Sequence, residues 1–116
     1  MRVPQDAALL RIYLGESDRC DGRPAFEAIV AAARDERLAG ATVLRGPLGF
    51  GRSSRFHTAK ILRLSDDLPL VIEIVDAADR IEAFLPKLAP MVGSGLVTVE
   101  KVRVIQYGDT PDGVAR

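Results

Sequence analysis

Two kinds of hydrophobic pattern alternate along the chain: a period of two residues, typical of strands, and the three- to four-residue spacing typical of helices. Residues 8–14 place every second apolar side chain on one face, which predicts a strand. Similar patterns predict strands at residues 41–45, 58–64, 70–75 and 97–104. Residues 70–75 are almost wholly apolar, so we expect this strand to lie in the middle of a sheet.

Two segments between these strands have helical spacing. The first begins at Pro24, whose missing N–H is not needed in the first turn of a helix, and we expect it to end at Gly40. The second begins after Asp76, whose carboxylate can cap it, and ends at the turn of residues 93–95. Pro86 lies inside this second helix and predicts a kink, because its ring displaces the carbonyl four residues before it.

The last strand pattern changes phase in its middle. Val97 and Val99 occupy one phase, whereas Val102 and Val104 occupy the other. We therefore expect a bulge or a turn at residues 100–101.

The predicted order of elements is β-α-β, a loop, and then β-β-α-β, within a single domain of residues 1–116. Two β-α-β units joined through a hairpin make the ferredoxin-like βαββαβ sandwich, an α+β fold with an antiparallel sheet and two helices on one face. The other face carries apolar residues such as Leu9, Val71 and Val75. We expect a second subunit to cover this face, because large apolar surfaces are rarely left in water.

Composition narrows the class of protein. Of the 116 residues, 47% are hydrophobic and 28% are charged, as in ordinary globular domains. Sixteen basic residues balance sixteen acidic ones, which argues against a nucleic-acid-binding protein. The first residues resemble neither a signal peptide nor a membrane span, so we expect a cytoplasmic protein that is not embedded in a membrane.

Catalytic motifs are not recognisable in the sequence. It contains no nucleophile elbow, no dinucleotide fingerprint and no pair of carboxylates at a catalytic spacing. We therefore expect a protein that is not an enzyme. Cys20 and His57 are the only cysteine and histidine, too few for a structural zinc site within one chain.

The segment of residues 46–57 is the main candidate for binding, and we expect it to be a flexible loop, as we expect of the tail of residues 107–116. It contains glycines, whose backbone N–H groups can approach an anion, and it carries or adjoins arginines that supply charged donors. The candidates are Arg45, Gly46, Gly49, Gly51, Arg52 and Arg55. One interpretation is a loop that binds an anion or a partner protein, and the other is a surface loop whose glycines only make turns.

Three further segments allow two interpretations each. His57 makes either a structural hydrogen bond or, in an oligomer, a metal site with carboxylates. Gly93, Ser94 and Gly95 form either a tight turn or a phosphate cradle. Residues 16–19 are either a polar turn or part of a ligand site. Glu73 lies in an apolar strand, where we expect an ion pair with Lys60 or Arg63, and the alternative is an acid in a ligand cleft.

Three stretches of the chain, residues 10–18, 40–60 and 67–76, together resemble the PII-like family known as domain of unknown function 190, over roughly residues 8–106. The Gly-Phe-Gly-Arg element of residues 49–52 and the run of residues 68–75 are also similar to PII signal-transduction proteins. The resemblance covers most of the chain and rests on several motifs in a fixed order.

The resemblance implies a homotrimeric regulatory protein that binds a small anionic ligand, such as a nucleotide, in clefts between subunits. It adds Arg103 to the candidate ligand-binding residues. It also implies a partner protein, and the position of such genes near those of ion-export proteins suggests a membrane transporter. The alternative is a metal-binding trimer similar to the copper-tolerance (CutA-like) proteins, with His57 and carboxylates as ligands. The residues specify no cofactor.

This chain departs from the PII pattern at three places. Residues 46–64 contain no tyrosine, so the covalent switch of PII proteins is absent. The turn at residues 93–95 is shortened and lacks the lysine that contacts phosphate in PII proteins. Gln106 and Gly108 stand where PII proteins have further phosphate-binding arginines. The last two departures weaken the expectation of nucleotide binding in the PII manner.

Overall fold

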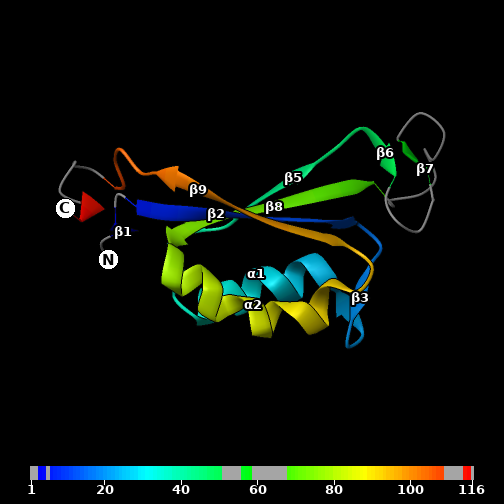
Figure 1. Cartoon of the computed structure of the whole chain (residues 1–116). Coiled ribbons are helices and arrows are strands. Elements are labelled where there is room, and N and C mark those ends of the chain that lie inside the picture. The colour runs from blue at the N-terminus through cyan, green and yellow to red at the C-terminus, as the bar shows by residue number, and fades with distance from the viewer. Residues whose placement is uncertain (1–2, 5, 51–55, 59–67, 109–113, 116) are drawn as a thin grey trace.

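The computed structural model describes residues 3–4, 6–50, 56–58, 68–108 and 114–115. Its centre is a four-stranded antiparallel sheet with two helices on one face (Figure 1), which confirms the α+β fold. The strands, in spatial order, are β5 (Thr42–Arg45), β8 (Pro69–Ala77), β2 (Asp6–Gly15) and β9 (Leu96–Arg103). The helices are α1 (Ala25–Asp35) and α2 (Ala78–Val92).

Three small two-stranded ribbons accompany this sheet. They are β3 (Arg19–Cys20) with β4 (Arg23–Pro24), β6 (Leu48–Phe50) with β7 (Phe56–Thr58), and the parallel pair β1 (Val3–Pro4) with β10 (Val114–Ala115). The β6–β7 hairpin lies at one end of the sheet and the β1–β10 pair at the other (Figure 1). The strand expected at residues 58–64 lies almost wholly outside the described residues.

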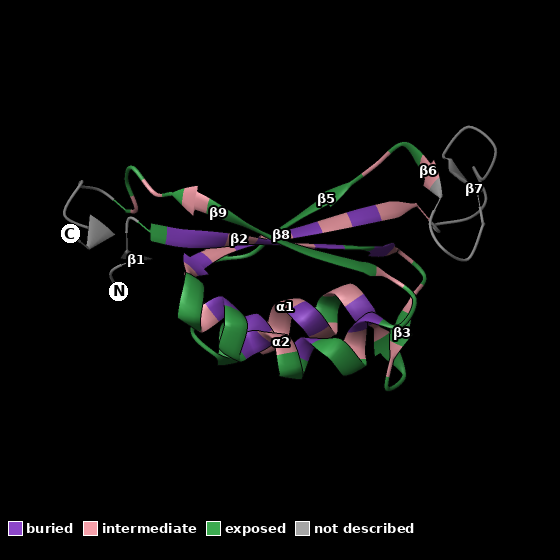
Figure 2. Cartoon of the chain, in the orientation of Figure 1, coloured by how far each residue is buried: buried purple, intermediate pink, exposed green. Residues whose placement is uncertain are grey.

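The hydrophobic core lies between the central strands and the helices (Figure 2). Alternate residues of β2 and β8 face the helices and are buried, which is the burial pattern that a period of two predicts. The fully buried apolar side chains of this layer are Leu10, Ile12, Ile29, Ile72, Ile74, Ile81, Phe84 and Leu88. The core therefore buries one face of the two central strands, whereas the edge strands are more exposed.

Helix α1 ends earlier than Gly40, where the sequence pattern placed its stop. Arg37 adopts a left-handed conformation with φ 59°, and the backbone N–H of Leu38 donates to the carbonyl of Ala33 over 3.1 Å. This is how a residue with positive φ closes the end of a helix. The expected glycine stop was wrong because an arginine takes the left-handed position instead.

Asp76 is not the cap of α2, although we expected it to be. Strand β8 continues through Ala77, so the Asp76 side chain is directed toward the helix layer and is fully buried. Its carboxylate accepts hydrogen bonds from the backbone N–H of Ala39 (2.8 Å) and from the Arg80 guanidinium (3.1 Å). Asp76 therefore connects β8 to the segment before β5 and to the first turn of α2. The kink expected at Pro86 stays a prediction.

Strand β9 pairs with β2 without interruption, so the bulge expected at residues 100–101 is wrong. The register runs from Tyr13 opposite Leu96 to Asp6 opposite Arg103. Because β9 is an edge strand that the helices do not cover, its apolar side chains change face while its backbone stays regular. Val97 and Val99 lie on the helix side, and Val102 lies on the open face of the sheet.

Candidate functional site

Two of the candidate loop residues, Arg45 and Gly46, lie where three strands meet at one end of the sheet. Gly15, the last residue of β2, pairs with Pro69, the first residue of β8. Arg45 ends β5, and the N–H of the following Gly46 donates to the carbonyl of Pro69 over 2.7 Å. We call the residues Gly15, Glu16, Arg45, Gly46 and Pro69 the loop base, because the β6–β7 hairpin begins here.

An ion pair joins two of the strands at the loop base. The guanidinium of Arg45 donates from Nη2 to Oε2 of Glu16. The Glu16 side chain is only 15% exposed, whereas that of Arg45 is 57% exposed. The Glu16 N–H donates to the carbonyl of Leu68 over 2.8 Å, and the Asp18 carboxylate accepts from the N–H of Gly15 over 3.0 Å. Residues 15–18 thus form a hydrogen-bonded turn that also holds a carboxylate against Arg45.

The described glycines of the hairpin pack closely against Pro69. A Cβ atom on Gly46 would lie 3.1 Å from Cγ of Pro69, and one on Gly49 would lie 3.2 Å from the same atom. The N–H of Gly46 is already used within the strand junction. For Gly46, the structure therefore favours a packing role over anion binding by its backbone N–H. Gly51, Arg52 and Arg55 lie outside the described residues.

The turn of residues 93–95 lies at the same end of the sheet as the loop base, because β9 begins opposite Tyr13. A Cβ atom on Gly95 would be 2.5 Å from the Tyr13 carbonyl oxygen and 2.9 Å from Cγ1 of Val92. The Gly95 N–H donates to the Val92 carbonyl over 3.2 Å. A tight turn therefore accounts for Gly95, whereas Gly93 and Ser94 are exposed.

Arg103 lies at the opposite end of the sheet, where it pairs in register with Asp6. Strand β9 has eight residues, which separates its two ends by about 23 Å at the usual rise of a strand. One chain therefore does not bring Arg103 and the loop base together.

The open face of the sheet carries an ion cluster that the sequence pattern did not predict. Arg11 donates from Nε to Glu73 over 3.0 Å and from Nη1 to Glu100 over 2.7 Å. The hydrogen bond that Arg11 donates to Glu73 is the main cause that raises the pKa of Arg11 above its ordinary value. Glu73 thus pairs with Arg11 across the strands, whereas its expected partners, Lys60 and Arg63, lie outside the described residues. The sequence did show one signal, because Arg11 is a charged residue that alternates with the apolar positions of β2. That Glu73 is its partner follows only from the pairing of β2 with β8.

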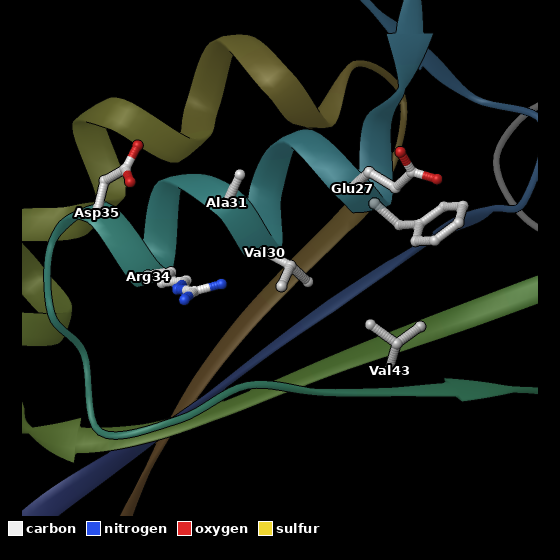
Figure 3. Close-up of a pocket in the computed structure, with 7 residues that line it drawn as sticks. Glu27, Val30, Ala31, Arg34, Asp35 and Val43 are labelled. Carbon is white, nitrogen blue, oxygen red and sulfur yellow. The ribbon is translucent and has the colours of Figure 1, made fainter.

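A groove of about 540 Å³ lies between α1 and the edge strand β5 (Figure 3). Its apolar lining is formed by Phe26 and Val30 of α1 and by Val43 of β5, on the opposite side. Glu27, Ala31, Arg34 and Asp35 also line it. Among the described strands, β5 is the outermost of the sheet on this side, and it has only four residues. Sequence reasoning missed it, since its walls come from a helix face and a strand that the pattern treated as ordinary core.

The metal alternative depends on His57, which lies in β7 opposite Gly49. The position of its side chain lies outside what the structure describes. Within the described ranges, no three residues of the histidine, cysteine, aspartate and glutamate types come together as metal ligands. Metal binding through His57 therefore stays a prediction. The described helices include none that is long and apolar enough to cross a membrane.

Sequence comparison finds a family match over most of the chain. The DUF190 family model, described as uncharacterized ACR, matches residues 7–104. A UPF0166 protein of Aquifex aeolicus (strain VF5) is 35% identical over 97 residues, which cover 84% of this chain and 91% of the relative. The UPF0166 protein MJ1524 of Methanocaldococcus jannaschii is 35% identical over 105 residues, covering 90% and 95% of the two chains.

Structure comparison finds PII-like proteins. The chain is similar to CPII, a nitrogen regulatory PII-like protein from Thiomonas intermedia K12 solved with ADP, AMP and bicarbonate, with a TM-score of 0.66 and 18% identity over 85% of this chain and 88% of CPII. A second CPII structure, with ADP, AMP and acetate, has a TM-score of 0.63 and 17% identity over 97% of both chains. At this identity the similarity establishes the PII-like fold.

Proposed function

This chain belongs to the DUF190 family and has the PII-like fold, and from this we propose that it is a non-enzymatic regulatory protein which binds a small anionic ligand. The ligand-binding part is the loop base, and the reporting part is the β6–β7 hairpin that follows it. We place the protein in the cytoplasm, with a partner protein, such as a membrane transporter, as the target of regulation.

The observation that carries this proposal is the position of Arg45. It is the last residue of β5, directly before the hairpin, and its side chain is 57% exposed at the end of the sheet. An arginine in this position can donate several hydrogen bonds to a carboxylate, a phosphate or a bicarbonate. The ligands in the two CPII structures are anions of this kind.

A homotrimer with clefts between subunits is the second part of the proposal. Two observations support it. The open face of the sheet keeps Leu9, Val71 and Val75 only half-buried in a single chain, as expected of a face that another subunit covers. Arg103 lies at the far end of the sheet from Arg45, so a second copy would have to supply it to the cleft.

Regulation then requires no chemical step. A bound anion stabilises one arrangement of the hairpin that begins at Gly46, and the partner protein distinguishes this arrangement from the unoccupied one. The size of the response is limited by the difference in ligand affinity between the two arrangements.

The test is calorimetric titration of the purified protein with ADP, AMP and bicarbonate separately, with the mass of the assembly measured by light scattering. We expect a trimer that binds at least one of these anions. Arg45→Ala should weaken binding by roughly tenfold to a hundredfold, as loss of a charged hydrogen bond does. Lys87→Ala is the matched control, because Lys87 is 55% exposed and also pairs with one carboxylate, Glu36, away from the loop base. Equal affinities for wild type and Arg45→Ala would contradict the proposal.

A further inference from the structure

The arginine at the loop base already holds an anion that belongs to the chain itself. We infer that the Glu16 carboxylate is an internal competitor for Arg45, which an external anion must displace in order to bind. The inference rests on the proposed function and adds its regulation and its ligand class. The ligand would present a planar, carboxylate-like oxyanion, as bicarbonate does, because that is the group it replaces.

The backbone of the turn that carries Glu16 is held in place by hydrogen bonds. The Glu16 N–H donates to the carbonyl of Leu68 (2.8 Å), and the Gly15 N–H donates to the Asp18 carboxylate, which closes the turn. The Glu16 side chain is only 15% exposed to solvent. A buried carboxylate is far more costly without a partner than an exposed one. Glu16 therefore competes strongly for Arg45.

Arg45, in contrast, has spare donor capacity and access to solvent. A guanidinium has five N–H donors, and only Nη2 is engaged by Glu16. An approaching anion can therefore still reach free N–H donors of Arg45, but it is repelled by the nearby negative charge of Glu16. Backbone donors do not offset this repulsion, since the N–H groups of Glu16 and Gly46 are used within the strand junction. The net charge of the Glu16–Arg45 pair is zero, so the loop base attracts anions only weakly until Glu16 moves.

Displacement of Glu16 would give the loop base two discrete states. In one, Arg45 ties β5 to the turn after β2, and in the other it is bound to the ligand and the turn is released. Glu16 lies in a turn, outside the regular pairing of β2 with β8, so its side chain can move without breaking the sheet. Ligand occupancy is thereby transmitted to residues 16–18 as well as to the hairpin.

The experiment compares anion binding by wild type, Glu16→Gln and Glu36→Gln, with bicarbonate and AMP as separate probes in calorimetry. Glu16→Gln keeps the size of the side chain and removes its charge, so we expect affinity for bicarbonate, the planar probe, to rise by about tenfold. Affinity for AMP, whose phosphate is tetrahedral, should rise less. Glu36→Gln removes a carboxylate from an equivalent surface pair with Lys87 and should leave the affinity unchanged. Glu16→Asp, which keeps the charge but shortens the side chain, should bind the probe more tightly than wild type and less tightly than Glu16→Gln, and it decides the question if Glu16→Gln fails to fold.

Each outcome distinguishes the two proposals. Tighter binding by Glu16→Gln, or binding by this variant alone, supports an internal competitor. Binding by wild type with no gain in Glu16→Gln overturns the inference and leaves the proposed function standing. If neither protein binds either probe, both the competitor and an anion site at Arg45 are wrong.

Discussion

Replacement of Asp76 by alanine should destabilise the fold strongly, because this carboxylate connects three parts of the chain. Its side chain is 1% exposed. It accepts from the Ala39 N–H over 2.8 Å and from Arg80 over 3.1 Å, and Arg80 in turn donates to the carbonyls of Glu36 and Arg37 at the end of α1. Tyr107 donates its hydroxyl to the carbonyl of Ala39 over 2.8 Å, so the same short segment is held from both sides.

The expected loss of stability follows from these contacts. Asp76→Ala leaves the N–H of Ala39 without its acceptor, which costs about 1–3 kcal/mol. It also removes the anionic partner of Arg80, but Arg80 is 34% exposed and keeps the carbonyls of Glu36 and Arg37, so this loss adds only about 1 kcal/mol. For a chain of this size, a total of about 2–4 kcal/mol corresponds to a fall in Tm of roughly 8–16 °C. Asp76→Asn retains an acceptor for the Ala39 N–H and should lose only about 1–2 kcal/mol.

The assay is thermal and urea unfolding followed by circular dichroism, at one fixed protein concentration because assembly would shift Tm. Asp79→Ala is the control, since Asp79 is an exposed acidic residue in the first turn of α2. Its loss should cost no more than about 1 kcal/mol, through the helix dipole. If Asp76→Ala and Asp79→Ala unfold at similar temperatures, the Asp76 contacts do not stabilise the fold as argued.

Two further predictions concern the turn before β9 and the open face. Gly95→Ala should lower the free energy of unfolding by about 1–3 kcal/mol, because the new Cβ would meet the Tyr13 carbonyl. Gly40→Ala is the control: no atom lies within 4 Å of its Cβ, so the free energy of unfolding should change by less than about 1 kcal/mol. Equal urea midpoints for the two variants would refute the steric argument. The coupling of Arg11 and Glu73 in a double-mutant cycle should shrink as NaCl rises from about 0.1 M to about 1 M. The coupling should persist as the pH rises to about 10, because the pKa of Arg11 is raised and Arg11 therefore stays charged at this pH. The contribution of the ion pair to stability is lost only at a pH above the ordinary pKa of arginine. A coupling energy that does not change with salt would contradict an ion pair.

The fold was predictable because its determinants are local. Alternation along β2 and β8 and the helical spacing of α1 and α2 each depend on neighbouring residues, and these four elements make the core. The errors arose where a residue's role depends on distant pairing. Asp76 reads as a helix cap from its neighbours, but the continuation of β8 to Ala77 directs it inward. The change of phase of the apolar residues in 97–104 predicted a bulge. In the structure the strand is regular, and the apolar side chains simply move from one face of this edge strand to the other.

The candidate site was predictable only in part, for the same reason. The glycines and arginines of the loop pointed to Arg45, but the residues gave no sign that Glu16, which lies 29 positions away, would pair with it. That pairing depends on β2 and β5 both flanking β8, so that the ends of the two strands come together. The partner of Glu73 was missed in the same way, because Arg11 lies on the neighbouring strand at a distance of 62 positions.

The separation of Arg45 from Arg103 restricts how copies of the chain can assemble around a shared site. The two arginines lie on opposite edge strands, β5 and β9, and at opposite ends of the sheet. A cleft that contains both therefore joins unlike surfaces of two subunits. Each subunit then contacts one neighbour through its β5 edge and another through its β9 edge. If every subunit is related to the next by the same rotation, such contacts can close into a ring, and a trimer is one such ring. In the proposed trimer, this geometry would give one anion site for each subunit, each made of Arg45 from one copy and Arg103 from the next. A mixed assembly of Arg45→Ala and Arg103→Ala chains should then regain intact sites, whereas neither variant alone should have any.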